Sequence, residues 1–302
     1  MRALVVDHGE SGPVRFADVD EPVPTSGEAL VEIRHIGLNF GELNYVHQWP
    51  AGAVHGHDAA GIVVRAASDG SGPPEGTRVA LGMSAHAWAE RVAVRPSALA
   101  TVPESVDLAD GAAPGIAGVT ALRVLRTRSL LARNVLITGA SGGVGHFAVQ
   151  LAALAGARVT ALVGSPDRAA GLSELGADQV LTDLAETEDH FDLVLDTVAG
   201  PLLARAWNSL AEGGTIHLVG YSSGQDTTFP SGALFGFGES RSIATYGDMT
   251  PTSEDLTDLL GLMAAGRLTA PVGLRGDWRD VDDAVRALFA RKVHGKIVLD
   301  VR

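Results

Sequence analysis

The middle of the chain alternates short apolar runs with segments of helical spacing. An apolar run at 135–138 is followed by a glycine-rich turn, a helical pattern and a second apolar run at 158–163. Short apolar runs bounded by turn residues are typical of strands buried on both faces of a parallel sheet. The strands expected in this region are 135–138, 158–163, 179–182, 193–197, 215–219 and 242–246. Six strands that alternate with helices predict a doubly wound parallel sheet.

Turn residues predict where the first helices of this region begin and end. Gly156 is expected to end the helix after the glycine turn, and Gly176 the helix after that, because glycine adopts the left-handed conformation common at helix ends. Ser165 as N-cap and Pro166 at the first helical position are expected to open the second helix.

The two ends of the chain predict a second, β-rich unit. The first hundred residues contain short alternating runs separated by Gly, Pro, Ser and Asp, which indicate strands at 2–7, 28–36, 61–67, 78–81 and 89–94. Helical spacing follows at 109–131. The tail predicts helices at 253–265 and 281–291 and a final strand at 296–300. We expect this last strand to rejoin the N-terminal unit.

The glycine-rich turn at 139–145, GASGGVG, lies between a strand and a helix. In that position glycines let the backbone approach a pyrophosphate closely, and the helix N-terminus offers free N–H groups and partial positive charge. The motif therefore predicts a dinucleotide-binding βαβ unit. The alternative interpretation is a glycine-rich turn in some other α/β protein.

Composition narrows the class of protein. The 302 residues are enough for two domains, and 46% hydrophobic and 20% charged residues are typical of a soluble globular protein. No apolar run reaches the roughly 18 residues that cross a membrane. Since the N-terminus also lacks the apolar core of a signal peptide, we expect a cytoplasmic protein.

Cysteine content and charge exclude several functions. The chain has no cysteine, which excludes disulfides, thiolate zinc sites and cysteine nucleophiles. The net charge is −13, and no block of basic residues offsets it. Neither nucleic acid nor an anionic membrane is therefore expected as a partner.

Several blocks occur in a fixed order over nearly the whole chain: GLNF at 37–40, GHDAAGIV at 56–63, GVTAL at 118–122, ASGGVG at 140–145, ELGAD at 174–178, DTV at 196–198 and GKIV at 295–298. With these blocks the chain resembles the medium-chain dehydrogenase/reductase superfamily, in its zinc-independent quinone oxidoreductase and enoyl reductase branch. The resemblance implies a GroES-like catalytic domain at 1–112 and 249–302 and a Rossmann NADPH-binding domain at 113–248. It also implies an active site in the cleft between the two domains.

The resemblance bears on zinc as well. Zinc-dependent relatives carry cysteines in the stretches that match 37–42 and 113–119, where this chain has none. Only His57 and Asp58 remain at matching ligand positions, and two ligands do not close a zinc site. We therefore expect no functional metal. A different metal on the His55–Asp58 segment is the alternative to a plain turn before a core strand.

The end of the second Rossmann strand indicates the cofactor. NAD-specific folds place a carboxylate there, whereas this chain has Gly164 and Ser165, with Arg168 shortly after. In the NADPH enzymes that the chain resembles, a basic residue at this place contacts the 2′-phosphate, and arginine suits that contact. We therefore expect NADPH, although Asp183 would oppose the phosphate if it pointed inward. The alternative is that Arg168 is only a solvated residue.

The resemblance also implies the remaining site residues. Segment 37–50 matches the family's active-site loop, which makes Asn39 and Tyr45 the candidate catalytic residues, with Tyr45 donating to the substrate carbonyl. The expected cleft walls are Phe40, Tyr45, Trp49 and Phe235, each of which could instead be ordinary packing. The expected cofactor contacts are Asn39, Thr120, Ala140, Ser141, Gly142, Gly143, Val144, Gly145, Gly164, Ser165, Arg168, Val198, Gly220, Tyr221 and Lys296. Lys296 could alternatively be a surface lysine on the final strand.

The leading interpretation is a zinc-independent, NADPH-dependent reductase of quinones or of the C=C bond of α,β-unsaturated carbonyls. A second is an enoyl-thioester reductase of polyketide or fatty-acid synthesis, with Arg123, Arg126 and Arg128 as a modest basic cluster. A third, from another class, is a non-catalytic NADPH-binding sensor or scaffold. The resemblance further suggests a homodimer joined through the apolar strand at 242–246, because an unpaired edge of this kind needs covering.

Overall fold

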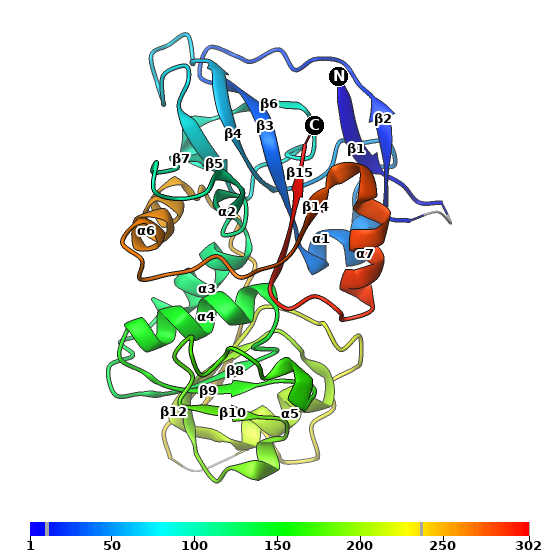
Figure 1. Ribbon diagram of the computed structural model, residues 1–302. Coiled ribbons are helices and arrows are strands. Elements are labelled where there is room, and N and C mark those ends of the chain that lie inside the picture. The colour runs from blue at the N-terminus through cyan, green and yellow to red at the C-terminus, as the bar shows by residue number, and fades with distance from the viewer. Residues whose placement is uncertain (10–11, 236–237, 302) are drawn as a thin grey trace. The chain divides into compact units, whose positions relative to one another are not determined.

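The computed structural model describes residues 1–9, 12–235 and 238–301. The chain divides into two compact units (Figure 1). Unit 1 comprises Met1–Val119 and Met249–Arg302, and unit 2 comprises Thr120–Asp248. The sequence analysis expects the first boundary after residue 112. In the structure, residues 113–119 belong to unit 1 instead of unit 2.

Unit 1 is built around a sheet in the order β14-β15-β3-β4-β5-β7, with β6 also paired to β3. Its strands are β3 (Ala29–Leu38), β4 (Asp58–Arg65), β5 (Arg78–Leu81), β6 (Arg91–Val94), β7 (Leu99–Thr101), β14 (Val272–Asp277) and β15 (Lys296–Asp300). A separate antiparallel pair consists of β1 (Arg2–Val6) and β2 (Val14–Asp18). β15 pairs antiparallel with β3, which confirms that the last strand rejoins the N-terminal unit.

The helices of this unit that precede or follow these strands are α1 (Phe40–Asn44), α2 (Leu108–Gly111), α6 (Ser253–Ala264) and α7 (Val281–Phe289). α2, α6 and α7 contact strands of the sheet, and α1 contacts α7. The single helix expected at 109–131 is wrong, since α2 is followed by a break and then by α3 (Ala117–Leu125). Pro114 lies in the break. Proline has no N–H for the helix and disfavours helical geometry in the residue before it, which accounts for the interruption.

Unit 2 contains a sheet in the order β10-β9-β8-β11-β12-β13 whose neighbouring strands are all parallel. The strands are β8 (Asn134–Thr138), β9 (Arg158–Leu162), β10 (Gln179–Leu181), β11 (Phe191–Asp196), β12 (Leu210–Leu218) and β13 (Ser242–Thr245). The order of strands outward in both directions from β8 is that of a Rossmann fold. The predicted doubly wound sheet is therefore confirmed.

Helices α4 (Gly143–Leu154) and α5 (Gly200–Asn208) connect strands of this sheet. The α-helix expected after Ser165 is wrong: a single 3₁₀ turn at Pro166–Arg168 is followed by turns through Gly176, and the Ser165 side chain makes no capping hydrogen bond. Gly171 and Gly176 both have positive φ, which interrupts any regular helix across this segment. None of the helices in the described ranges is long and apolar enough to cross a membrane.

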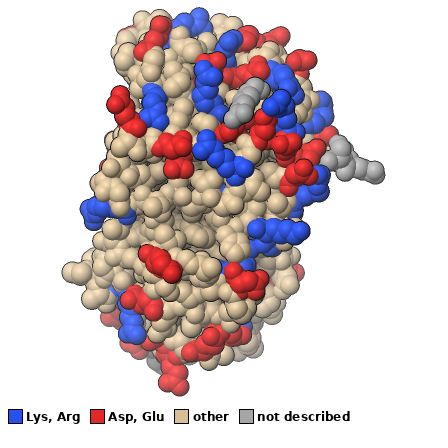
Figure 2. All heavy atoms as spheres, in the orientation of Figure 1, with Lys and Arg blue, Asp and Glu red and all other residues tan. Residues whose placement is uncertain are grey.

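Charged side chains of both signs lie near one another on one face of the protein. On the face shown in Figure 2, Lys and Arg side chains lie among Asp and Glu side chains. The Asp and Glu side chains account for the negative net charge of −13.

Gly56, two residues before β4, packs closely against the core of unit 1. Its φ is +92°, and a Cβ there would lie 2.1 Å from the ring of the fully buried Trp88. Gly52 has a similar φ of +82° but open space around it. We expect Gly56→Ala to lower the free energy of unfolding by about 3 kcal/mol or more, because backbone strain and overpacking add.

The matched variant Gly52→Ala carries the backbone strain alone and should cost about 1 kcal/mol. Urea denaturation followed by tryptophan fluorescence measures both values. Equal losses for the two variants would show that the Trp88 contact is not a constraint.

Candidate active site

Five polar side chains meet in unit 1 at the end of β3: Asn39, Glu42, His57, Asp58 and Lys296. The strand pairing explains why residues so distant in sequence meet. β3 lies between β4 and β15 (Figure 1), with Gly37 opposite Asp58 and Leu38 opposite Ile297. The end of β3 therefore faces the beginnings of both neighbours. We refer to the five side chains as the buried network.

Asn39 lies at the centre of the buried network, directly after β3. Its Nδ2 donates to Glu42 Oε2 at 2.7 Å and to Asp58 Oδ2 at 2.8 Å, and its Oδ1 accepts from Lys296 Nζ at 2.5 Å. Its backbone N–H also donates to Glu42 Oε2, at 2.9 Å. Since both amide hydrogens are engaged within the protein, Asn39 cross-links the carboxylates.

Asp58 and Lys296 form an ion pair inside the protein. Lys296 Nζ lies 3.1 Å from Asp58 Oδ2, with 2% and 0% of the side chains exposed. Burial raises the pKa of Asp58, and the Lys296 charge opposes that rise. The alternative of a surface lysine at 296 is thus wrong. Its ammonium supplies the positive charge that a buried carboxylate requires.

Glu42 and His57 form the second pair, with His57 Nδ1 donating to Glu42 Oε1 at 2.8 Å. Burial acts to raise the pKa of Glu42, but the hydrogen bond and charge of His57 outweigh it, and the pKa is lowered. Burial acts to lower the pKa of His57, but the hydrogen bond and charge of Glu42 outweigh it, and the pKa is raised. Both shifts favour an imidazolium–carboxylate pair.

Aromatic rings enclose the histidines of this segment. Trp49 lies edge-to-face with His57 at 6.0 Å and with His55 at 5.0 Å between ring centroids. His55 is buried, and its Nε2 donates to the Glu42 carbonyl at 3.1 Å. Burial lowers the pKa of His55. Burial therefore favours the neutral form of His55, which supports the backbone of α1, whereas the Glu42 carboxylate favours the protonated form of His57.

The other residues expected at the substrate lie in different surroundings. Tyr45 ends α1, with its ring 6.4 Å from that of His47. Phe40 instead packs edge-to-face on Phe289 at 5.7 Å, under the Arg291 guanidinium. In unit 2, 77% of Phe235 is exposed. Of these candidates, Trp49 is the one whose side chain contacts the buried network.

In unit 2 the glycine turn closes tightly between β8 and α4. Gly139 has a φ of +61°, and a Cβ there would lie 2.3 Å from Thr197 Oγ1. A Cβ on Gly145 would lie 2.5 Å from Ala140 Cα. α4 begins at Gly143, with Gly142 as N-cap, so the first N–H groups of a 12-residue helix have no helical acceptor. Residues 140–145 therefore form a cradle that suits a pyrophosphate.

Arg168 lies against this turn. Its Nε donates to Ser141 Oγ at 2.7 Å, and Ser141 is buried. A Cβ built on Gly164, between β9 and the Arg168 turn, would meet no heavy atom within 4 Å. Asp183, which would oppose a phosphate, pairs with Arg205 and accepts from the Ala185 N–H. The arrangement suits a cofactor with an additional phosphate.

A buried carboxylate ties β11 to β8 at the same edge of the sheet. Asp196 accepts from the Thr138 hydroxyl and from the backbone N–H of Val198 and Ala199. Burial raises its pKa, and the Thr138 hydroxyl opposes the rise. Among the other expected cofactor contacts, Thr120 is buried and Tyr221 is half exposed. A Cβ built on Gly220 would touch the Thr197 carbonyl.

Sequence reasoning missed the buried network as a unit. Asn39 was expected as a catalytic and cofactor-binding residue and Lys296 as a separate cofactor contact. His57 and Asp58 entered only as positions that match metal ligands in zinc-dependent relatives, and Glu42 was given no role of its own within the segment 37–50. A usable pattern was present, since Asp58 opens an otherwise apolar strand, DAAGIVV. A carboxylate in such a strand needs a buried cation.

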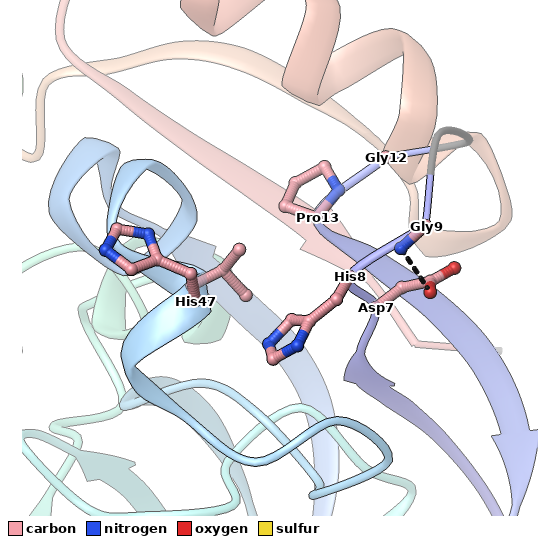
Figure 3. Close-up of a pocket in the computed structure, with 7 residues that line it drawn as sticks. Asp7, His8, Gly9, Gly12, Pro13 and His47 are labelled. Carbon is pink, nitrogen blue, oxygen red and sulfur yellow. Dashed lines mark hydrogen bonds between the residues drawn. The ribbon is translucent and has the colours of Figure 1, made fainter.

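Unit 1 also contains an open pocket of about 360 Å³, lined by Asp7, His8, Gly9, Gly12, Pro13, Val46 and His47. Figure 3 shows His8 and His47 approaching it from separate segments. None of the expected site residues lines it.

Comparison with known proteins places the chain in a family. The alcohol dehydrogenase GroES-like domain family matches residues 25–119, and the zinc-binding dehydrogenase family matches residues 143–265. Over 252 residues the chain is 30% identical to the acrylyl-CoA reductase AcuI of Ruegeria pomeroyi, covering 74% of this chain and 75% of that protein. The chain belongs to the medium-chain dehydrogenase/reductase superfamily.

Solved structures of the superfamily share the fold. A mycobacterial quinone oxidoreductase aligns with a TM-score of 0.83 at 26% identity, over 99% of each chain. A mycobacterial protein complexed with NADPH aligns with a TM-score of 0.86 at 25% identity, again over 99% of each chain. The GroES-like and Rossmann domains inferred from the sequence are confirmed.

The donor set of this chain does not fit the catalytic zinc that the second family's description implies. No cysteine is present in the sequence. The carboxylate of Asp58 is paired with Lys296, and that of Glu42 with His57. A zinc ion there would need three protein ligands free of such partners.

The Lys296–Asp58 pair predicts a specific stability cost. Lys296→Met should lower the free energy of unfolding by about 3 kcal/mol, because it leaves the buried Asp58 carboxylate without its cation. The double variant Lys296→Met/Asp58→Asn should recover most of this loss, since it removes both charges.

Urea denaturation of wild type, both single variants and the double variant gives the coupling energy of the pair. Additive losses would show that the two side chains do not stabilise each other.

Proposed function

We propose that the chain is a zinc-independent, NADPH-dependent reductase that transfers hydride to a quinone or to the C=C bond of an α,β-unsaturated carbonyl. The observation that carries this proposal is the pairing of both buried carboxylates with protein cations. With Asp58 held by Lys296 and Glu42 by His57, neither carboxylate is free to hold a metal ion, and polarisation of a substrate carbonyl would fall to hydrogen-bond donors.

Conjugated acceptors suit such a site. Oxidising an alcohol without a Lewis acid is difficult, whereas a quinone or an enone is already polarised through conjugation. Its oxygen becomes an enolate or a hydroquinone oxygen as hydride arrives, and fixed hydrogen-bond donors stabilise that charge. The quinone oxidoreductase and acrylyl-CoA reductase among the similar proteins support both acceptor types.

Unit 2 provides the residues that would hold the cofactor. The turn at 140–145 and the N-terminus of α4 would bind the pyrophosphate, and Arg168 with Ser165 and Gly164 would bind the 2′-phosphate. Thr120, Val198, Gly220 and Tyr221 are proposed as further contacts. NADPH supplies the hydride. Within unit 1, Tyr45 is proposed to donate a hydrogen bond to the substrate carbonyl, and Trp49 to pack against the acceptor.

Reduction of an enoyl thioester to the saturated acyl thioester is the second candidate function. The similarity to an acrylyl-CoA reductase favours it, because acrylyl-CoA is a conjugated thioester. The same chain residues would act on it, since the thioester carbonyl also gains negative charge when hydride reaches the β-carbon.

The experiment that tests the proposed function is oxidation of NADPH and of NADH, followed by absorbance. The panel contains benzoquinones, naphthoquinones, alkenals, cyclic enones and crotonyl thioesters, each with and without a chelator. We expect turnover of at least one acceptor class with NADPH, unchanged by the chelator. A chelator-sensitive activity, or binding of NADPH without turnover of any acceptor, would contradict the proposal.

Replacement of Arg168 tests the choice of cofactor. Arg168→Ala should raise KM for NADPH about tenfold or more and leave KM for NADH nearly unchanged, because a charge-assisted hydrogen bond contributes about 1.5–3 kcal/mol. Arg158→Ala is the control, since Arg158 is an exposed arginine at the opposite end of β9. Equal KM changes for the two cofactors would remove Arg168 from phosphate recognition.

A further inference from the structure

Two polar atoms of the buried network make no hydrogen bond among the described residues, Asp58 Oδ1 and His57 Nε2, and they differ in accessibility and chemistry. Asp58 is fully buried and its carboxylate oxygen can only accept, whereas the His57 side chain is partly exposed and its Nε2 is a nitrogen that can donate. The Asn39 amide hydrogens, both Glu42 oxygens and the Lys296 ammonium all have partners within the network. Among the described residues, His57 forms its hydrogen bond through Nδ1 to Glu42, and Nε2 makes none. Its side chain is 12% exposed, against 3% for Glu42.

We propose that His57 is the proton donor of the reductase, through Nε2, and that Glu42 is the positioning residue that holds it. This assignment rests on the proposed function, because it names the source of the proton that accompanies the hydride.

The geometry around Glu42 fixes the imidazole ring. Glu42 Oε1 accepts from His57 Nδ1, which leaves Nε2 as the nitrogen that can act on a ligand. Glu42 Oε2 is held in turn by the Asn39 side chain and by the Asn39 backbone N–H. Two bonds on one oxygen and one on the other prevent the carboxylate from rotating. A donor fixed in this way does not need to reorganise when charge develops on the substrate.

Other acids in unit 1 fit the role less well. The Lys296 ammonium neutralises the buried Asp58, so loss of its proton would leave that carboxylate without a cation. The Tyr45 ring contacts His47, and none of the hydrogen bonds among the described residues orients its hydroxyl. His57 combines a ring fixed by Glu42, a partly exposed nitrogen, and a carboxylate partner that favours its protonated form.

In this proposal, the proton moves from His57 to the substrate oxygen as the hydride arrives. When the β-carbon of an enone or the ring of a quinone gains a hydride, one electron pair moves onto the carbonyl oxygen. The Nε2–H bond of the imidazolium breaks and an O–H bond forms, which gives the enol of the saturated carbonyl or, from a quinone, the keto tautomer of the hydroquinone. His57 is left neutral, with Nδ1–H still donated to Glu42, and it regains its proton from water. The enol then tautomerises to the saturated carbonyl, and the keto tautomer loses its ring C–H proton and gains a proton on the second oxygen to give the hydroquinone.

Replacement of His57 is the direct test. His57→Gln should lower kcat about 100-fold or more, the size expected for loss of a general acid. Affinity for NADPH, measured by fluorescence titration, should remain within about threefold of wild type. Unchanged cofactor affinity and an unchanged melting temperature separate a lost proton donor from a disrupted fold.

The chain offers a matched control in unit 1. His35 donates through Nδ1 to Asp300 at 2.8 Å and is 14% exposed, so it forms the same kind of histidine–carboxylate pair on β3. His35→Gln should leave kcat within about twofold. A loss as large as that of His57→Gln would mean that any such pair affects kcat through stability, and would overturn the proposal.

Recovery of kcat by added imidazole distinguishes a proton donor from a residue with only a structural role. In His57→Ala, imidazole added to the buffer should restore kcat at least tenfold in a saturable manner, because it replaces the missing acid. Glu42→Gln should lower kcat without creating an imidazole response, since His57 is still present.

The outcomes separate this proposal from the proposed function. Wild-type turnover together with a His57→Gln kcat within threefold of wild type would overturn the proton donor alone. Absence of wild-type turnover on every acceptor would overturn the proposed function, and the proton donor with it.

Discussion

Four charged side chains are buried together where β3 ends, and the structure depends on their mutual neutralisation. An isolated ion in such a place costs several kcal/mol, whereas the pairs Asp58–Lys296 and Glu42–His57, linked through Asn39, leave no net charge. Neutrality requires β15 to pair with β3, because Lys296 is the first residue of β15. The pairing of β15 with β3 therefore both completes this part of the sheet in unit 1 and brings the Lys296 charge to the candidate site.

The same pairing limits the chemistry. A metal enzyme polarises its substrate with a metal ion that is bound by side chains without other partners. Here the carboxylates of Asp58 and Glu42 are already paired with Lys296 and His57. Lys296 is enclosed, with 2% of its side chain exposed, so its charge acts on Asp58. In the proposed reaction, the His57 imidazolium acts on a ligand through Nε2, and this role fits a substrate that needs one hydrogen bond rather than a Lewis acid. A conjugated carbonyl and a quinone, the proposed acceptors, both meet that condition.

The fold was largely predictable because its patterns are local. The strand–turn–helix from β8 to α4 is contiguous, and the six parallel strands each show as a short apolar run. The predictions failed where local geometry overrode periodicity, at Pro114 and at the positive φ of Gly171 and Gly176. α1 and β14 (Val272–Asp277) escaped notice because a five-residue helix and a strand with exposed alternate positions carry little apolar pattern.

The site was predictable only in part, for a related reason. In unit 2 the expected residues follow the ends of strands. The turn at 140–145 and Arg168 belong to one strand–helix–strand unit and the turn after it, so their order along the sequence brings them together. In unit 1, Lys296 and Asn39 are 257 residues apart and meet through strand register. A shift of one residue in β15 would turn Lys296 to the opposite face of the sheet. Residue types alone do not specify register, so the sequence could name Asn39, His57 and Lys296 without revealing that they act on one another.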